Sequence, residues 1–397
     1  MKAKANKKEI LKTLRAYSMV IVLVAIAVLF HFLTDGLIFT SMNLTNLILQ
    51  NSYVVILILG MLPVILTGNV DLSVGSILAF VGAVAAILQV NMGWGTVPTL
   101  LVSLIIGIAV GSWNGLWIAK FDIPPFIVTL STQLAVRGLT MVVLDGASIG
   151  PFHATFRWIS SSFIAETLGA DPFMLTMILA VVCCAIFAFL QFKDRKAKIA
   201  HGVPVKPIRN TLITVIALSA VILVLSLVMA GYKGYPTVLL LMLVLTLIYN
   251  FVCNRTMFGR SLYAIGGNRK AAALSGIKDR KGMFLAYANM GLMSAVAALV
   301  YAARLNASTP KAGTGFELDA IAACYVGGAS VSGGAGTIGG ALIGCFVIAI
   351  LNNGMSMMGV SADWQQTVKG LVILAAVAFD MIPKAKKMNA GRYFCFQ

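Results

Sequence analysis

Long uninterrupted runs of apolar residues, rather than alternating apolar and polar positions, dominate this sequence. A helix needs roughly 20 mostly apolar residues to cross the hydrocarbon layer of a membrane, and several runs reach that length. Alternation would favour the strands of a closed barrel, whereas continuous runs favour helices, which satisfy their own backbone hydrogen bonds in lipid. The pattern therefore predicts an all-α, polytopic transmembrane bundle of about 10–12 spans. The segments expected to span are roughly 17–39, 52–68, 73–91, 96–119, 126–146, 172–192, 211–231, 236–253, 284–303, 317–332, 338–357 and 365–382.

Composition supports a membrane protein. Hydrophobic residues make up 59% of the 397 residues and charged residues 11%, against about 45–50% and about 25% in soluble domains. This surplus of apolar side chains is too large for one core, so much of it must face lipid. The three histidines are scattered and no cysteines form a C-x-x-C pair, so no metal site is expected.

The net charge of +17 reflects basic residues that gather in particular loops. They cluster before the first span, in 193–209, in 255–281 and after 384, and are sparse in the alternate loops. The positive-inside rule therefore places both termini and the basic loops in the cytoplasm. Aromatic residues are not interleaved with the basic ones as in single-strand nucleic-acid platforms, so no nucleic-acid partner is expected.

Two clusters of glycine interrupt the apolar pattern, Gly68–Gly82 and Gly327–Gly344, one in each half of the chain. Broken helices at membrane depth are tolerated only where they line a cavity or are buried in protein. Interrupted segments in both halves favour a transport path between internal repeats. The alternative is ordinary helix packing through small residues, which needs no path.

Polar side chains lie inside the first cluster, at Asn69, Asp71 and Ser73. Intramembrane polar groups are costly, so each needs a reason. One interpretation is that the three residues line a polar translocation path. The other is that Asp71 or Ser73 caps the helix that follows by accepting from its free N–H groups. Both can hold at once.

Two basic residues, Arg137 and Lys369, fall inside predicted spans. A lone charge at such a position snorkels to the membrane surface or pairs with an acid. The sequence offers four acidic candidates without choosing among them: Asp145, Glu317, Asp319 and Asp380. Proton relays chain Asp, Glu or His across a membrane, and the deep segments here are poor in such groups, which disfavours a proton-driven carrier.

Several long motifs resemble those of one transporter family. They are Thr67-Gly68-Asn69-Val70-Asp71-Leu72-Ser73-Val74-Gly75, Pro124-Pro125-Phe126-Ile127-Val128-Thr129-Leu130, Phe316-Glu317-Leu318-Asp319-Ala320-Ile321-Ala322-Ala323 and Leu351-Asn352-Asn353-Gly354. They resemble the permease subunits of bacterial monosaccharide ABC importers, the ribose, xylose and galactose class, which is related to the branched-chain amino acid permeases. The resemblance covers nearly the whole chain and is strongest to the larger xylose and multiple-monosaccharide permeases.

The resemblance implies a function. The chain would be the transmembrane permease that moves a monosaccharide, a pentose or hexose with xylose among the candidates, across the bacterial inner membrane. Its implied partners are an ABC ATPase subunit, a periplasmic or lipid-anchored sugar-binding protein, a second permease copy and membrane lipid. The alternative is a stand-alone secondary carrier or channel for a small polar solute, which would need ion-coupling acids in the membrane.

The cytoplasmic loop 254–283 holds a short predicted helix. Asn268 can cap its start and Gly276 can end it, while small alanines would let it sit close in a groove. The resemblance implies that this helix couples the permease to the ATPase. Because a capped helix of this length can turn its first residues to solvent, we expect Arg269 and Lys270 to face solvent. The alternative is a basic loop that only fixes topology. The residues assigned to coupling are Gly267, Asn268, Ala271, Ala272, Leu274 and Gly276.

The sequence contains no G-x-x-x-x-G-K-[ST] phosphate-binding loop. We therefore expect no enzyme and no cofactor in this chain, with ATP bound by the partner subunit. Residues 1–397 are expected to form a single transmembrane permease domain. Residues 193–235 depart from most of the family and read as an insertion with one basic loop and one extra span. Ala335 stands where many relatives have arginine between two glycines.

Overall fold

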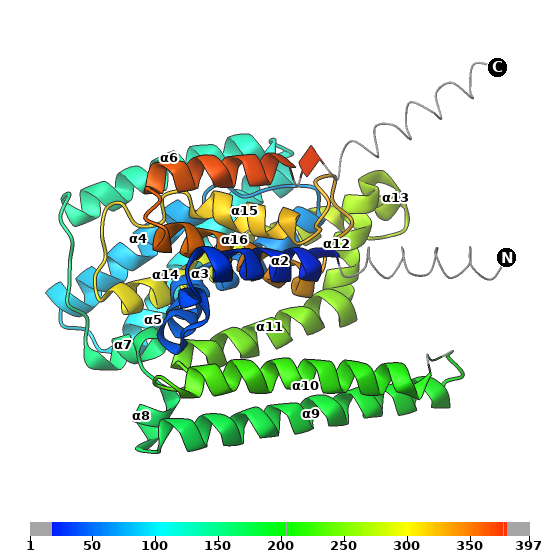
Figure 1. The fold of residues 1–397 in the computed structure, drawn as a ribbon. Coiled ribbons are helices and arrows are strands. Elements are labelled where there is room, and N and C mark those ends of the chain that lie inside the picture. The colour runs from blue at the N-terminus through cyan, green and yellow to red at the C-terminus, as the bar shows by residue number, and fades with distance from the viewer. Residues whose placement is uncertain (1–17, 204, 206, 376, 379–397) are drawn as a thin grey trace.

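The computed structural model describes residues 18–203, 205, 207–375 and 377–378, and every named element in these ranges is a helix (Figure 1). Nine of the described helices are long and apolar enough to cross a membrane. They are α3 (Ser41–Leu66), α4 (Val74–Ala86) with the π-helical turn Ile87–Asn91, α5 (Thr96–Phe121), α6 (Pro125–Leu144), α9 (Pro172–Ala200), α10 (Ile208–Ala230), α11 (Thr237–Arg255), α14 (Asp279–Leu305) and α16 (Ile338–Met357).

The other α-helices that the structure describes are shorter or less completely described. They are α2 (Ser18–Leu33), α7 (Ala154–Ser161), α8 (Ile164–Leu168), α12 (Met257–Gly267), α13 (Arg269–Leu274), α15 (Phe316–Val326) and a helix over 362–375. The predicted all-α polytopic bundle is confirmed.

Two predicted spans are shorter in the structure. The segment 317–332 contains a helix of only 11 residues, α15, which ends before Gly327. At about 1.5 Å per residue such a helix is too short to cross a bilayer. The helix of the segment 17–39 ends at Leu33, and a turn with a 3₁₀ segment, Leu37–Phe39, follows it. The end of the span predicted over 365–382 lies outside the described residues.

The centre of the bundle is formed by α3, α4 and α14, whose apolar windows are 67–72% buried. Helix α14 packs closely along α5 through glycines one turn apart. A methyl group added at Gly111 would lie 2.8 Å from Gly291 Cα, and one added at Gly107 would lie 2.5 Å from Gly291 O. Small residues at this spacing let helix backbones approach in a membrane, so α5 and α14 form one tightly packed pair.

Helices α9 and α10 form a hairpin along one edge of the bundle (Figure 1). Only 11% of the apolar window of each is buried in the chain, which leaves most of their surface for lipid. The basic stretch expected as a loop from residue 193 instead continues α9 to Ala200. Its Lys198 forms an ion pair with Asp194 one turn earlier, at 2.6 Å.

The bundle has two distinct ends (Figure 1). Helix α13 and the turn between α9 and α10 lie at one end, and α7 and α8 lie at the other. The two basic loops that the structure describes are therefore at the same end of the molecule, as the positive-inside argument requires. The basic residues before 18 and after 378 lie outside the described residues.

Candidate functional site

The first interrupted segment, 67–73, joins α3 to α4 and is held by buried hydrogen bonds. Asp71 Oδ1 accepts from the backbone N–H of Ser73 at 2.8 Å and from its hydroxyl at 2.6 Å. Asn114 of α5 donates to Ser73 Oγ at 2.9 Å, and Thr132 of α6 donates to Asn114 Oδ1 at 2.6 Å. This chain of bonds fastens the break between α3 and α4 to two further helices.

The structure brings Asp71 and Ser73 into direct contact and leaves Asn69 apart. Asp71 and Ser73 are fully buried, whereas Asn69 is half-buried and donates to Thr67 Oγ1 at 2.9 Å. Ser73 occupies the N-cap position of α4 but makes no side-chain cap hydrogen bond. The capping interpretation is therefore wrong in its detail, because the Asp71 carboxylate accepts from Ser73 at the N-cap position rather than from the N–H groups in the first turn of α4.

Three residues that the sequence analysis did not single out complete this segment. Asn114 and Thr132 extend the hydrogen-bond chain, and Tyr287 of α14 donates its hydroxyl to Val70 O at 3.2 Å. The role of Asn114 could have been predicted from the sequence, since an amide inside the apolar run of α5 needs a polar partner. Tyr287 carried none, because a tyrosine in an apolar run is ordinary core.

The second interrupted segment, 327–337, follows the short helix α15 and is held mainly by its backbone. A methyl group added at Gly344 would lie 2.6 Å from Gly327 N, so α16 and the end of α15 touch backbone to backbone. Gly333 and Gly334 have φ values of +78° and +71°, in the left-handed region that favours glycine. The hydroxyl of Thr337 then caps α16 by accepting from Gly340 N at 3.0 Å.

The two interrupted segments meet. The backbone N–H of Gly334 donates to Leu66 O, the last residue of α3, at 3.0 Å. A methyl group added at Gly333 would lie 2.6 Å from Gly68 N. Gly68 and Gly333 are 265 positions apart in the sequence, yet the two glycine clusters form a single backbone junction.

Helix α12 reaches the same junction. A methyl group added at Gly266 would lie 2.5 Å from Gly334 N and 3.0 Å from Leu66 C. Three residues earlier, the Tyr263 hydroxyl donates to Gly336 O at 2.7 Å. The end of α12 therefore contacts the second interrupted segment and the last residue of α3, which directly precedes the first.

The short helix predicted in loop 254–283 is present as α13. Asn268 accepts from Ala271 N at 3.0 Å through its side chain, which confirms the predicted cap. Gly276 has a φ of +83° just after the helix ends. Gly267, Asn268, Ala271 and Gly276 are exposed, and Leu274 is 92% exposed.

Ala272 differs from the other residues assigned to coupling. It is only 4% exposed and packs against its own chain, because it lies on the inner face of α13. A partner would meet Ala271, Ala273 and Leu274 instead. The expectation that Ala272 faces the ATPase is corrected on this point.

Arg269 is also corrected, since it is not simply turned to solvent. Its Nε donates to Asp279 Oδ2 at 2.7 Å, and its Nη2 donates to Asp122 Oδ1 at 2.7 Å. Arg280 occupies the second oxygen of Asp122 at 3.1 Å. The hydrogen bond from Arg269 and the two positive charges hold the pKa of the Asp122 carboxyl below its usual range. Arg269 thereby ties α13 to the end of α5 and the start of α14.

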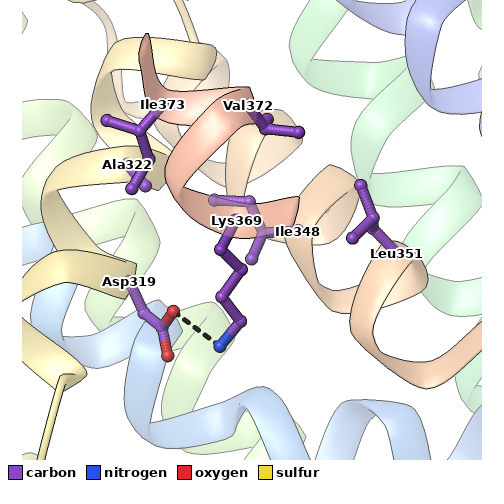
Figure 2. A pocket seen from close by; sticks show the side chains of 7 residues that line it. All are labelled: Asp319, Ala322, Ile348, Leu351, Lys369, Val372 and Ile373. Carbon is purple, nitrogen blue, oxygen red and sulfur yellow. Dashed lines mark hydrogen bonds and ion pairs between the residues drawn. The ribbon is translucent and has the colours of Figure 1, made fainter. Parts of the chain in front are cut away.

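The partners of the two intramembrane basic residues are now defined. Lys369 Nζ lies 3.0 Å from Asp319 Oδ1, and Figure 2 shows the two side chains pointing toward each other at the lining of a small cavity. Arg137 donates to the main-chain carbonyls of Ala312 at 2.5 Å and Pro310 at 3.3 Å rather than to a carboxylate. Asp380, a further candidate, lies outside the described residues.

The comparisons with known proteins identify the family. Residues 43–377 match the model of the family described as branched-chain amino acid transport system / permease component. The chain belongs to this permease family. The xylose transport system permease protein of Escherichia coli K12 is 39% identical over 94% of this chain and 93% of its own. The corresponding xylose protein of Haemophilus influenzae is 37% identical over 94% and 98%.

A more distant relative extends the picture. The ribose import permease protein of Bacillus subtilis is 36% identical over 85% of this chain and 84% of its own. No solved structure matches the chain. The predicted family, the transport role and the assignment as a permease component rather than an enzyme are confirmed by these matches.

Proposed function

We propose that this chain is the membrane permease of a bacterial ABC importer and moves a monosaccharide into the cytoplasm, driven by ATP hydrolysis on a separate subunit. The observation that carries the proposal is the match over almost the full length to permeases named for xylose and ribose transport. Both named sugars are pentoses. A pentose is therefore the first substrate to test, with xylose before ribose because its relatives match more of the chain.

The coupling role of α13 is supported by its surface. Leu274 is a large apolar side chain that is 92% exposed at the same end of the bundle as the basic loops. Exposed apolar side chains that gather with small neighbours mark protein contact sites. In this proposal Leu274, with Ala271 and Ala273 beside it, seats in a groove of the ATPase.

The remaining partners and the orientation also belong to the proposal. A second copy of the permease would complete the path, and a periplasmic or lipid-anchored binding protein would deliver the sugar. The chain would lie in the inner membrane with both termini in the cytoplasm. Cysteines introduced at Lys198 and Lys278 should then be labelled only by reagents that enter the cytoplasm, and one at Lys311 from outside. Labelling at Lys278 from outside would reverse the orientation.

The path role of Asn69, Asp71 and Ser73 is supported by their place in an interrupted segment at the meeting point of two breaks. The half-buried Asn69 would border the path, and the buried Asp71 and Ser73 would line it when the second segment moves away from the first. Asp71→Leu should reduce sugar uptake while the complex with the ATPase still assembles. Normal uptake by this variant would remove Asp71 from the path.

A specific observation favours a second candidate, a carrier driven by an ion gradient. Asp71 Oδ2 and Glu317 Oε2 are buried without a hydrogen-bond partner in the described part of the chain. Buried intramembrane carboxyls of this kind are the groups that ion-coupled carriers use. The resemblance to xylose and ribose permeases outweighs this observation, and the experiment below separates the two candidates.

Uptake of ¹⁴C-xylose into proteoliposomes tests the proposal. Vesicles that hold the permease with its ATPase and binding protein should accumulate xylose only with hydrolysable ATP. Vesicles that hold the permease alone should accumulate none under an imposed proton or sodium gradient. Gradient-driven uptake without the ATPase would establish the carrier instead.

Two variants test the contact surface of α13. Leu274→Glu places a charge where the groove would exclude water, so we expect loss of ATPase co-purification with an unchanged melting temperature. Leu274→Met keeps an apolar side chain and should bind normally. Ala272→Glu should instead lower the yield of folded protein, because Ala272 is buried in its own chain. Normal ATPase binding by Leu274→Glu would favour the basic-loop alternative.

A further inference from the structure

The end of α12 occupies an unusual position, in backbone contact with the second interrupted segment and with the residue that directly precedes the first. Gly266 touches Leu66, which ends α3, and Gly334, which belongs to the segment before α16. The next residue, Gly267, has no atom within 4 Å of the place where a side chain would begin. A methyl group added at Gly334 would lie 2.8 Å from Gly267 N, so the backbone of both glycines meets the second segment, but only the side-chain position of Gly266 faces it.

Tyr263 makes a second contact between α12 and the same region. Its hydroxyl donates to Gly336 O at 2.7 Å. Gly334 and Gly336 lie on either side of Ala335, so α12 holds the second segment at two points. Through the hydrogen bond from Gly334 N to Leu66 O, at 3.0 Å, the same contact includes the end of α3.

The connection between α12 and α13 is very short. Only Asn268 separates them, and its N–H still donates to Ala264 O of α12 at 3.0 Å while its side chain caps α13. A displacement of α13 must therefore displace the end of α12. Contacts between backbones transmit such a displacement well, because no flexible side chain lies between them to absorb it.

A second route leaves α13 through Arg269, which reaches Asp122 and Asp279. These ion pairs link α13 to the tightly packed α5–α14 pair. Arg269 and Asp122 are each more than 40% exposed, at 44% and 43%. Exposed ion pairs between long side chains are weak and screened by salt, so this route is the more compliant of the two.

We propose that Tyr263 and Gly266 are positioning residues that carry the movement of α13 to the junction of the two interrupted segments. The inference rests on the proposed function, in which an ATPase moves α13. It adds the place where that movement enters the membrane domain. The end of α12 connects α13, where the ATPase would bind, to the glycine junction. The ion pairs of Arg269 lead instead to α5 and α14.

The test compares four variants in proteoliposomes that contain the permease, its ATPase and its binding protein. They are Tyr263→Phe, which removes one hydroxyl, Gly266→Ala, Arg269→Gln, and Gly138→Ala of α6 as the matched control, since nothing lies within 4 Å of the place where its methyl group would be. Three quantities are measured: ATPase co-purification, ATP turnover, and ¹⁴C-xylose moved for each ATP hydrolysed. A melting temperature for each variant separates misfolding from uncoupling.

We expect Tyr263→Phe to bind the ATPase normally and to move about fivefold less xylose per ATP, the equilibrium factor that corresponds to one lost hydrogen bond. Gly266→Ala should be uncoupled at least as strongly, and Gly138→Ala and Arg269→Gln should keep the wild-type ratio. If Gly266→Ala does not fold, Tyr263→Phe still decides.

Two results would overturn the inference while the proposed function stands. One is a wild-type ratio in Tyr263→Phe, and the other is a loss of coupling confined to Arg269→Gln, which would place the route in the ion pairs. If the wild-type complex itself binds no ATPase and moves no xylose, the proposed function fails and the inference fails with it.

Discussion

The two interrupted segments are built in opposite ways. The first, 67–73, is held by side chains: the Asp71 carboxylate, the Ser73 hydroxyl and the Asn114 amide form one buried chain of hydrogen bonds. The second, 327–337, is held by glycines that bring backbones into contact at Gly327, Gly333 and Gly334. The first segment should therefore be sensitive to the loss of polar atoms, and the second to the gain of a methyl group.

The two interrupted segments are also attached to different helices. The first segment is fastened to α5, α6 and α14, which belong to the transmembrane bundle. The second is fastened to α12, which leads directly into α13. In the proposed mechanism the second segment follows α12 directly, whereas the polar network holds the first segment to the bundle. We therefore expect the second segment to move relative to the first.

The largest effect is expected from a methyl group of α16 placed against the second segment. Gly344→Ala would place its methyl 2.6 Å from Gly327 N in a buried contact, which should cost about 3 kcal/mol. Gly339→Ala is the control, since nothing lies within 4 Å there. It should gain up to about 1 kcal/mol from helix propensity. Denaturation in detergent, followed by circular dichroism, measures both, and equal effects would show that close packing does not hold this segment.

A smaller effect is expected from losing a hydroxyl in the first segment. Ser73→Ala removes the link between Asp71 and Asn114 and should cost about 2 kcal/mol. Ser76→Ala is the matched control, because the hydroxyl of Ser76 is equally buried but has no partner in the described structure. Its removal should be neutral. The same denaturation assay applies, and a neutral Ser73→Ala would show that the network is not what holds the segment.

A still smaller effect is expected at the far end of the network. Thr132→Val removes the hydroxyl that donates to Asn114 Oδ1 at 2.6 Å and should cost about 1 kcal/mol. In the double variant with Ser73→Ala the two costs should not add, because both act on one chain of hydrogen bonds. If the two losses of unfolding free energy simply add, the hydrogen bonds act as independent pairs and not as one network.

The smallest effect concerns pH. The pKa of Asp122 is lowered by Arg269 and Arg280, so its contribution to stability is present above the ordinary carboxyl pKa and is lost as pH falls through the lowered value. The melting-temperature difference between wild type and Asp122→Asn should stay constant from about pH 8 to about pH 5 and shrink only below about pH 4. A difference that changes near neutral pH would mean that another group is responsible.

The sequence predicted what depends on near neighbours. The cap at Asn268 and the glycine after α13 involve residues only a few positions apart, and both are present. The contact between Asp71 and Ser73 is equally local, although its form differed from the expected cap. The long apolar runs predicted the helices because span length depends on composition alone.

The sequence did not predict what depends on distant partners. Tyr287 and Val70 are 217 positions apart, and Arg269 and Asp122 are 147 apart. Nothing local to Arg269 distinguishes it from Lys270, so both were expected to face solvent. The prediction of a span over 317–332 was wrong for a different reason, because hydropathy alone does not show that the helix ends at Gly327 and Gly328.

The central claim is that the second segment moves against the first when the ATPase acts. Ser332 is exposed and its carbonyl lies beside Gly68. The labelling rate of Ser332→Cys, in a chain with Cys183, Cys184 and Cys395 replaced by serine, reports this movement in inside-out vesicles that hold the working complex. We predict that ATP binding changes the rate at position 332 and leaves that of Lys198→Cys, on the peripheral hairpin, unchanged. An unchanged rate at 332 in vesicles that still move xylose with ATP would contradict the account.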